Sequence, residues 1–225
     1  MPRLLLLLLL LVLAIDRTRC FTATARPTTR ARAIHRRRFA PSDVIESYNQ
    51  ALESSPLLTK SITAGIILGL ADFTGQKIEK NEKLNPERIL RFVVLGLALQ
   101  APWNHFYYQL LDSTIPPTSD PLSQTNLLKV MIDQFIQAPV FTVVIFFYLG
   151  FAEGGNFQSI VDEKLKPSYW KTMQDNWKLW VPATAVNIAF VNPIYRVLFL
   201  NCVFYFWSIY LSVTLNASSS EEEQQ

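Results

Sequence analysis

The stretch LLTKSITAGIILGLADFTGQ, residues 57–76, decides the fold, because a helix of about twenty apolar residues is long enough to cross the hydrocarbon core of a bilayer. Three further stretches of comparable length begin near Ile89, Leu127 and Ile194. Several such stretches in one chain are typical of a polytopic membrane protein. The sequence therefore predicts an all-α fold, a transmembrane four-helix bundle within residues 43–215.

The composition favours the same class of protein. Of the 225 residues, 50% are hydrophobic and only 17% are charged, which is too apolar for an ordinary soluble domain. The formal net charge of +3 comes from the first part of the chain, since acidic residues outnumber basic ones from Asp43 onward. The arginines before Asp43 form a run without aromatic or Gly-rich interleaving, so nucleic acid is not an expected partner. Only Cys202 lies in the part expected to fold, which excludes an internal disulfide there.

The first 42 residues are predicted to be a cleavable targeting leader. Arg3 and the apolar run over 4–15 have the pattern of a signal peptide, which we assign to residues 1–20. Residues 21–42 contain several arginines and no acidic residue, as an organelle transit peptide does. The two signals in series resemble the bipartite leaders of plastid proteins in algae with secondary plastids, and a Leu-rich mitochondrial presequence is the alternative. At the other end, residues 216–225 are predicted to be an acidic disordered tail.

The distribution of basic residues predicts the topology. The connections after the first and third apolar stretches are rich in Lys and Arg, whereas residues 113–126 have none. Four spans then place both ends of the bundle on the less basic side. The segment 177–193 is interrupted by polar residues and prolines, so it is predicted to be an interfacial or re-entrant segment before the last span. The predicted helix breaks are Pro102, Pro139, Pro182 and Pro193.

Each apolar stretch also carries polar or ionisable side chains, which are costly when they face lipid and so are expected to face other helices or water. The candidate pore or polar-layer residues are Asp72, Gln76, Arg88, Arg91, His105, Asp133, Gln134, Asn187 and Arg196. The predicted topology places Arg196 in one layer with Asp72 and Arg91, and His105 in a second layer with Asp133. We expect Asp72 to pair with Arg91 or Arg196, and His105 or Tyr108 to form a hydrogen bond with Asp133.

Four motifs carry a resemblance to a known family. They are AGIILGLADFTGQ (64–76), RILRF with APWNHFYY (88–92 and 101–108), KVMIDQFIQAP (129–139), and NWKLW, VN, YR and WSIYLS between 176 and 212. Over about residues 56–212 the chain resembles the Mpv-seventeen and peroxisomal membrane protein family. It departs from the family pattern at Ala71 and Ala101, where glycine is usual, at Val181, which replaces a proline, and at Asn192, where the proline is shifted to Pro193.

The resemblance implies a small four-helix integral protein of an organelle membrane, with a weakly selective channel activity that supports metabolite homeostasis. Together with the leader, it orders the expected locations as plastid, mitochondrial inner membrane and peroxisome. It implies no enzymatic activity and no cofactor. The expected partners are the lipid bilayer, small solutes or ions, and further copies of the chain.

Two functions therefore stay open. In the first, fixed charges at Asp72, Arg91, Asp133 and Arg196 line a narrow lumen and His105 makes conduction sensitive to pH. In the second, the protein is a non-conducting structural or assembly protein, and its polar layers only stabilise the helix bundle. An intramembrane enzyme is not expected, because the sequence has no HExxH, GxSxG or phosphate-binding loop motif.

Overall fold

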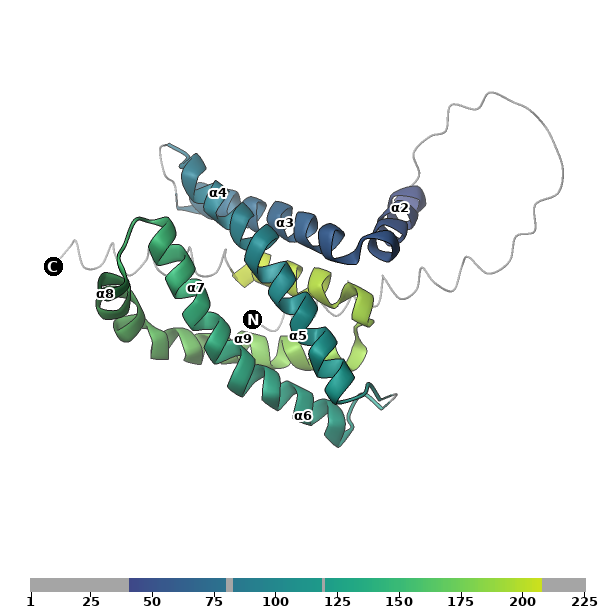
Figure 1. Ribbon diagram of the computed structural model, residues 1–225. Helices are drawn as coiled ribbons and strands as arrows, with labels where there is room; N and C mark the ends of the chain where they lie inside the picture. The colour runs from purple at the N-terminus through teal and green to yellow at the C-terminus, as the bar shows by residue number, and fades with distance from the viewer. Residues whose placement is uncertain (1–40, 80–82, 119, 208–225) are drawn as a thin grey trace, which may run out of the picture. The chain divides into compact units, whose positions relative to one another are not determined.

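The computed structural model describes residues 41–79, 83–118 and 120–207, and this part of the chain is helical with no strand (Figure 1). The prediction of an all-α fold is confirmed there. Nearly all of the predicted leader and the whole predicted tail lie outside the described residues, so both stay predictions. The chain divides into two compact units, Met1–Thr59 and Lys60–Gln225.

In the first unit the described residues form α2 (Pro41–Ser54) and the first turn of α3 (Pro56–Ile78). The Thr59 hydroxyl donates a hydrogen bond of 2.9 Å to the carbonyl oxygen of Ala51 and so joins the two helices across Ser55. The rest of α3 belongs to the second unit. The elements that follow it are α4 (Pro86–Val94), η2 (Leu95–Gln100), α5 (Ala101–Thr114), α6 (Gln124–Ile132), η3 (Asp133–Gln137), α7 (Ala138–Ala152), α8 (Phe157–Ser159), η4 (Ile160–Leu165), α9 (Lys166–Phe190) and a last helix within Pro193–Trp207.

Three of these elements, η2, η3 and η4, are π-helical turns, and each is followed at once by a helix with proline at its second position. The backbone N–H of Ala101 bonds to the carbonyl of Gly96, and that of Ala138 bonds to the carbonyl of Asp133, both five residues back. A proline ring collides with the carbonyl four residues earlier in a regular α-helix, and a wider turn removes the collision. Pro102 and Pro139 therefore follow bulges within continuous helices, and the predicted breaks there are wrong.

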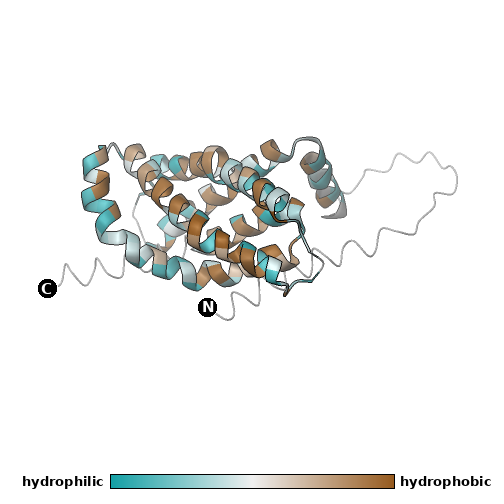
Figure 2. Cartoon of the chain, turned by 60° about the horizontal axis from the view of Figure 1, so that its bottom comes forward, coloured by the Kyte–Doolittle hydropathy of each residue, from teal (hydrophilic) through white to brown (hydrophobic). Residues whose placement is uncertain are grey.

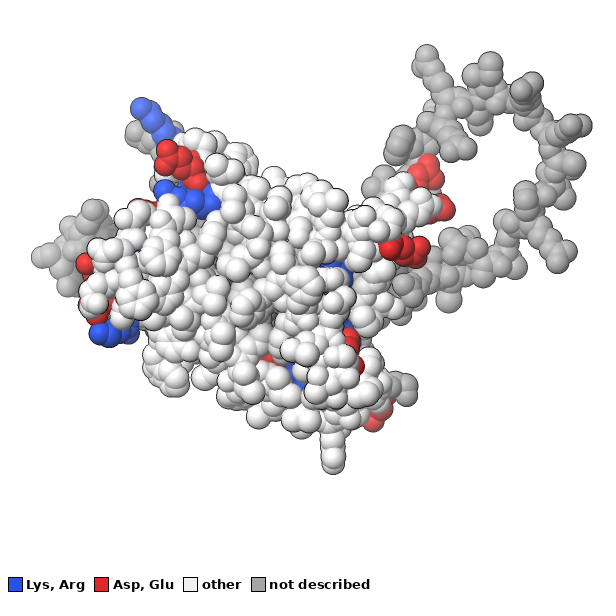
Figure 3. Space-filling view, viewed as in Figure 1, with Lys and Arg blue, Asp and Glu red and all other residues white. Residues whose placement is uncertain are grey.

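The second unit consists of helical passes that run between two ends. The passes are α3, α4 to α5, α6 to α7, α9, and the last helix. The first pass and the third, Gln124–Ala152, are long and apolar enough to span a membrane, and Pro193–Trp207 is a shorter apolar helix. Apolar residues predominate along these helices, with polar residues interspersed (Figure 2). Charged residues gather near α4 and α8, and the surface between them is largely uncharged (Figure 3).

The predicted re-entrant segment is instead part of α9, a single helix of 25 residues that continues through Pro182. This helix packs along α6, η3 and α7, and it lies beside them in Figure 1. Hydropathy could not reveal it, because its polar side chains serve contacts with neighbouring helices: Trp177 Nε1 donates to the carbonyl of Gln134, and Thr184 Oγ1 donates to Asp133. Only Pro193 marks a true break, between the end of α9 and the last helix.

A continuous α9 reverses the direction that was predicted for the last helix. Side-chain contacts fix this direction: Arg196 reaches Asp112 at the end of α5, Asn201 bonds to Gln100 in the middle, and Tyr205 bonds to Thr74 near the end of α3. The last helix therefore runs toward the end of the unit where α3 ends and α4 begins. We call this the charged end, after its residues Asp72, Glu79, Arg88, Arg91 and Glu153.

Close packing of α3 on the next pass depends on glycine. A Cβ atom at Gly96 would lie 2.5 Å from the carbonyl oxygen of Ala64, and one at Gly65 would lie 3.2 Å from that of Val93. Small residues on both passes therefore let the two helices approach closely. Ala64 also packs with Ala101 and Val197 in a fully buried cluster, so three passes meet there.

Polar side chains are buried inside the second unit among apolar ones, and much of its outside is apolar. Asp72, Gln76, Asp133 and Gln134 are each at most 4% exposed. Leu90, Phe106, Leu110 and Ile136 are all more than half exposed. Buried polar groups beneath exposed large apolar side chains suit a chain whose outer surface meets acyl tails.

Candidate functional site

A cavity of about 900 Å³ lies between the passes of the second unit. It extends from the charged end, where Glu79, Arg88 and Lys164 line it, to the middle of the bundle, where Asp133 and Thr184 line it. We call the second group, with Gln100, Tyr108 and Gln134, the floor of the cavity. Its walls are largely apolar and include the aromatic residues Phe92, Phe141, Phe146, Trp180, Phe204 and Trp207.

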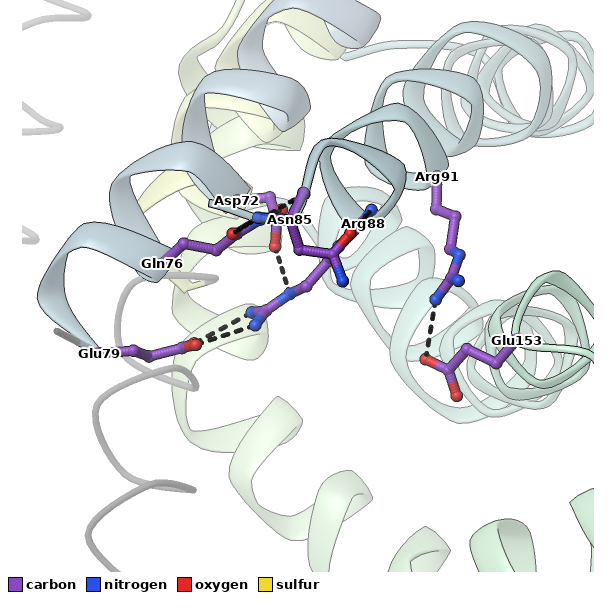
Figure 4. A network of polar contacts seen from close by, with 7 residues as sticks. All are labelled: Asp72, Gln76, Glu79, Asn85, Arg88, Arg91 and Glu153. Carbon is purple, nitrogen blue, oxygen red and sulfur yellow. Dashed lines mark hydrogen bonds and ion pairs between the residues drawn. The ribbon is translucent and has the colours of Figure 1, made fainter. Parts of the chain in front are cut away.

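At the entrance one arginine joins two helices (Figure 4). Arg88 Nε lies 2.7 Å from Asp72 Oδ1, and the two terminal nitrogens of its guanidinium bind both oxygens of Glu79 at 2.9 and 3.0 Å. Gln76 Nε2 donates hydrogen bonds to Asp72 Oδ2 at 2.7 Å and to the carbonyl oxygen of Asn85. Gln76 Oε1 accepts a hydrogen bond from the backbone N–H of Asn85. The partner of Asp72 is thus Arg88, which Asn85 positions by capping the first turn of α4.

The expected pairing of Asp72 with Arg91 or Arg196 is therefore wrong. Arg91 extends away from Asp72, and its guanidinium makes loose contacts of 3.8 Å with Glu87 and Glu153. The sequence predicted a basic partner for Asp72, because its carboxylate lies deep in an apolar stretch. It could not distinguish Arg88 from Arg91, which are less than one helical turn apart and differ in the direction of their side chains.

At the floor the Asp133 carboxylate accepts three hydrogen bonds. They come from Tyr108 at 3.2 Å, from Gln134 Nε2 at 2.8 Å and from Thr184 at 3.2 Å. The expected bond between Tyr108 and Asp133 is confirmed. Sequence reasoning missed Thr184, because it assigned that part of α9 to an interface. Gln100 Oε1 and Gln134 Oε1 are buried without a hydrogen-bond partner among the described residues.

Beyond the floor, toward the other end of the unit, lies a cluster of two basic residues and one acidic residue. Asp112 holds two buried cations, with Lys129 Nζ at 2.6 Å and an Arg196 nitrogen at 2.7 Å. The Arg196 guanidinium also lies over the ring of Tyr108, 5.8 Å from its centre. We call Asp112, Lys129 and Arg196 the closing cluster. Because α9 crosses the whole unit, Arg196 belongs here and its predicted place beside Asp72 is wrong.

The two remaining predicted residues also lie away from the entrance. His105 Nδ1 is 3.4 Å from Lys60 Nζ, so its neighbour is a lysine of α3 and the alternative bond to Asp133 is not formed. Asn187 is fully buried in α9. Within the part of the chain that the structure describes, no group of three His, Cys, Asp or Glu side chains could hold a metal ion.

The charged residues that line the cavity are mostly acidic. Five carboxylates face three basic side chains; the residues are Asp72, Glu79, Asp133, Glu153 and Asp175 against Arg88, Lys164 and Lys171. The cavity is therefore an acidic chamber with largely apolar walls that extends to the charged end. Its volume is large enough for a small solute, and at its floor the hydroxyls of Tyr108 and Thr184 both bond to Asp133.

Comparison with known proteins identifies relatives of the chain. A profile described as the Mpv17 / PMP22 family matches residues 150–212. The chain is 32% identical to peroxisomal membrane protein 2 of Bos taurus, over 76% of this chain and 89% of that protein. It is 29% identical to peroxisomal membrane protein PMP22 of Arabidopsis thaliana, over 78% and 90%, and 30% identical to protein sym1 of Schizosaccharomyces pombe, over 78% and 92%. No solved structure matches the chain significantly.

The match covers 89%, 90% and 92% of the length of these three relatives. The chain therefore belongs to the Mpv17 / PMP22 family of membrane proteins.

Proposed function

We propose that this protein is an organelle membrane protein that forms a weakly selective pathway for small solutes, and that the acidic cavity is the entrance of this pathway. The observation that carries the proposal is a cavity of about 900 Å³ with a buried polar floor inside a bundle whose outer surface is apolar. A helix bundle that only had to hold itself together would gain stability by filling such a space with apolar side chains.

In this proposal the closing cluster is the barrier. Lys129 and Arg196 are both buried and are held by one carboxylate, so their arrangement depends on Asp112. Loss of that charge leaves two neighbouring cations without their anion and pushes them apart. Opening of the pathway therefore requires Asp112 and its partners to separate.

Recordings from the purified chain in planar bilayers test the proposal. We expect small currents from the unaltered chain and a higher open probability for Asp112→Asn. Arg91→Gln is the matched control at the opposite end, because Arg91 makes only contacts of 3.8 Å and does not line the cavity. Silence of the unaltered chain and of Asp112→Asn, across voltage and ionic conditions, would refute a solute pathway.

A non-conducting assembly protein is the second candidate, and one observation favours it. Only 6% of the most apolar window of Gln124–Ala152 is buried by the rest of the described chain. This pass can therefore pack against another copy or another protein as well as against lipid. If Asp112→Asn reduces the amount of an isolated complex and no variant conducts, the assembly function is supported.

The organelle is also part of the proposal. Two relatives are named as peroxisomal membrane proteins, whereas the composition of residues 1–42 predicts entry into a plastid or a mitochondrion. We propose the plastid first, because a signal peptide in front of a transit-like segment has no use in the other two routes. Imaging of residues 1–42 fused to a fluorescent protein in the native cell checks this, and a peroxisomal signal would contradict it.

A further inference from the structure

We propose that the floor of the cavity binds solutes that carry a protonated amine on a short apolar body. The proposal rests on the proposed function, since it names the class of solute that the pathway accepts. Three features brought together in one cavity carry it: a buried carboxylate, two amide oxygens that lack donors, and aromatic walls.

The floor presents acceptors and lacks a cation. Asp133, Gln100 and Gln134 are 4%, 2% and 2% exposed, and all three line the cavity. Asp133 forms no ion pair with a Lys or Arg within residues 41–79, 83–118 and 120–207. A buried carboxylate without a counter-charge and buried oxygens without donors are both costly, so a ligand that supplies charge and donors is stabilised there.

A primary ammonium group meets both needs, because it carries one positive charge and three N–H donors in a compact head. The donors of the floor are already used within the protein. Gln134 Nε2 bonds to Asp133 and Thr184, and Gln100 Nε2 bonds to Asn201. An anionic head would meet acceptor oxygens and gain no donor in exchange. The chemistry of the floor thus selects against carboxylates and phosphates.

The walls explain the apolar body. Trp180 and Phe204 lie with their ring centres 6.4 Å apart, and both line the cavity. Aromatic faces attract an organic cation and also bury its alkyl part. The positive charges of the closing cluster do not cancel this preference, because Arg196 and Lys129 are engaged by Asp112 and do not line the cavity.

Three probes with four carbon atoms each separate the contribution of the charged head from that of the apolar body. Binding of n-butylammonium, n-butanol and n-butyrate to the full chain in detergent is measured by calorimetry and by the fluorescence of the cavity tryptophans. We expect n-butylammonium to bind at least about tenfold more tightly than n-butanol, and n-butyrate not to bind. Asp133→Asn should weaken n-butylammonium about tenfold and leave n-butanol unchanged.

Asp162→Asn is the matched control. Asp162 lies outside the spans in η4, and hydrogen bonds from Lys166 and then Gln158 hold the pKa of its carboxyl below its usual range. It therefore carries a full negative charge near neutral pH without lining the cavity. Equal loss of binding in both variants would mean that the amine responds to general surface charge, which would overturn the site.

Two other results would also overturn it: equal affinity for n-butanol and n-butylammonium, or unaltered binding to Asp133→Asn. The comparison of the three probes uses the unaltered chain, so it decides the question even if Asp133→Asn fails to fold. Potassium currents from the same preparation separate the two proposals. Currents without amine binding would refute the site alone, and amine binding without currents would refute the pathway alone.

Discussion

At the scale of single residues, side-chain direction decides which charges pair, since Arg88 binds Asp72 while Arg91, less than one turn away, extends toward Glu153. Asp72, Asp133 and Arg196 are all buried, as their positions in apolar stretches predicted. The pairing depends on side-chain direction and on the path of α9, and neither is encoded in local hydropathy. Arg196 illustrates this, since a change in the path of one helix moved it from the entrance to the closing cluster.

The entrance network gives a first prediction. Arg88→Gln leaves two carboxylates, Asp72 and Glu79, without their shared cation, although their side chains are only 1% and 7% exposed. Because Arg88 itself is about a third exposed, we expect a loss of about 2 kcal/mol of stability, less than for a fully buried pair. Thermal unfolding in detergent measures it. Arg91→Gln should change the midpoint little, and equal shifts for the two variants would contradict the assigned pairing.

The floor gives a second prediction. Tyr108→Phe removes one of three donors to Asp133 and keeps the ring on which Arg196 rests. We expect a loss of about 1–2 kcal/mol, since a buried acceptor loses a partner while packing is retained. The midpoint of thermal unfolding checks the change. The control is Tyr195→Phe, because Tyr195 lies in the short 3-10 helix η5 (Pro193–Tyr195) and does not line the cavity. An equal effect there would argue against a special role of the Tyr108 hydroxyl.

At the scale of elements, helix packing depends on where glycine allows backbones to approach. Gly96→Ala places a methyl group 2.5 Å from a carbonyl oxygen of α3, and neither backbone can move without separating the helices. We expect a loss of about 1–3 kcal/mol. Gly65→Ala is the matched control, because its nearest contact is 3.2 Å and a shift of a few tenths of an ångström accommodates it. Chemical or thermal unfolding should show that the Gly96→Ala variant is less stable than the Gly65→Ala variant. The reverse order of stability would refute this packing argument.

At the scale of the whole molecule, the path of the chain between the two ends is the main correction to the sequence-based prediction. The apolar length of the first and third passes was visible in the sequence, and the structure bears it out; the described part of the last helix, Pro193–Trp207, is apolar but shorter than predicted. The pass through α9 was not visible, because its polar residues, Pro182 among them, look like a break until their partners on α6 and η3 are known. Because the pass through α9 was missed, the assignment of loops by their charge gave four passes, an even number.

This correction gives a topological prediction. Single cysteines at three exposed positions, Gln158→Cys, Thr118→Cys and Asn192→Cys, are introduced one at a time into a chain that carries Cys20→Ser and Cys202→Ser, in sealed membranes. If α9 crosses, a membrane-impermeant maleimide labels positions 118 and 192 from one side and position 158 from the other. If positions 158 and 192 are labelled from the same side, the interfacial position predicted for residues 177–193 is supported and the crossing by α9 is refuted. Labelling of all three after detergent addition controls for access.

The π-helical turns have one more consequence, for the way this chain tolerates changes in length. Each holds one residue more than the α-helical turn that could replace it, so the loss of a single codon there closes the turn to an α-helical one and leaves both flanking helices in register. Deletion of Ala98 within η2 would therefore keep Tyr108 facing Asp133, although the ring of Pro102 would then meet a carbonyl of the tighter turn. Such turns absorb a frame-preserving deletion, whereas the same deletion in a regular stretch of the pass would rotate all that follows by about 100°.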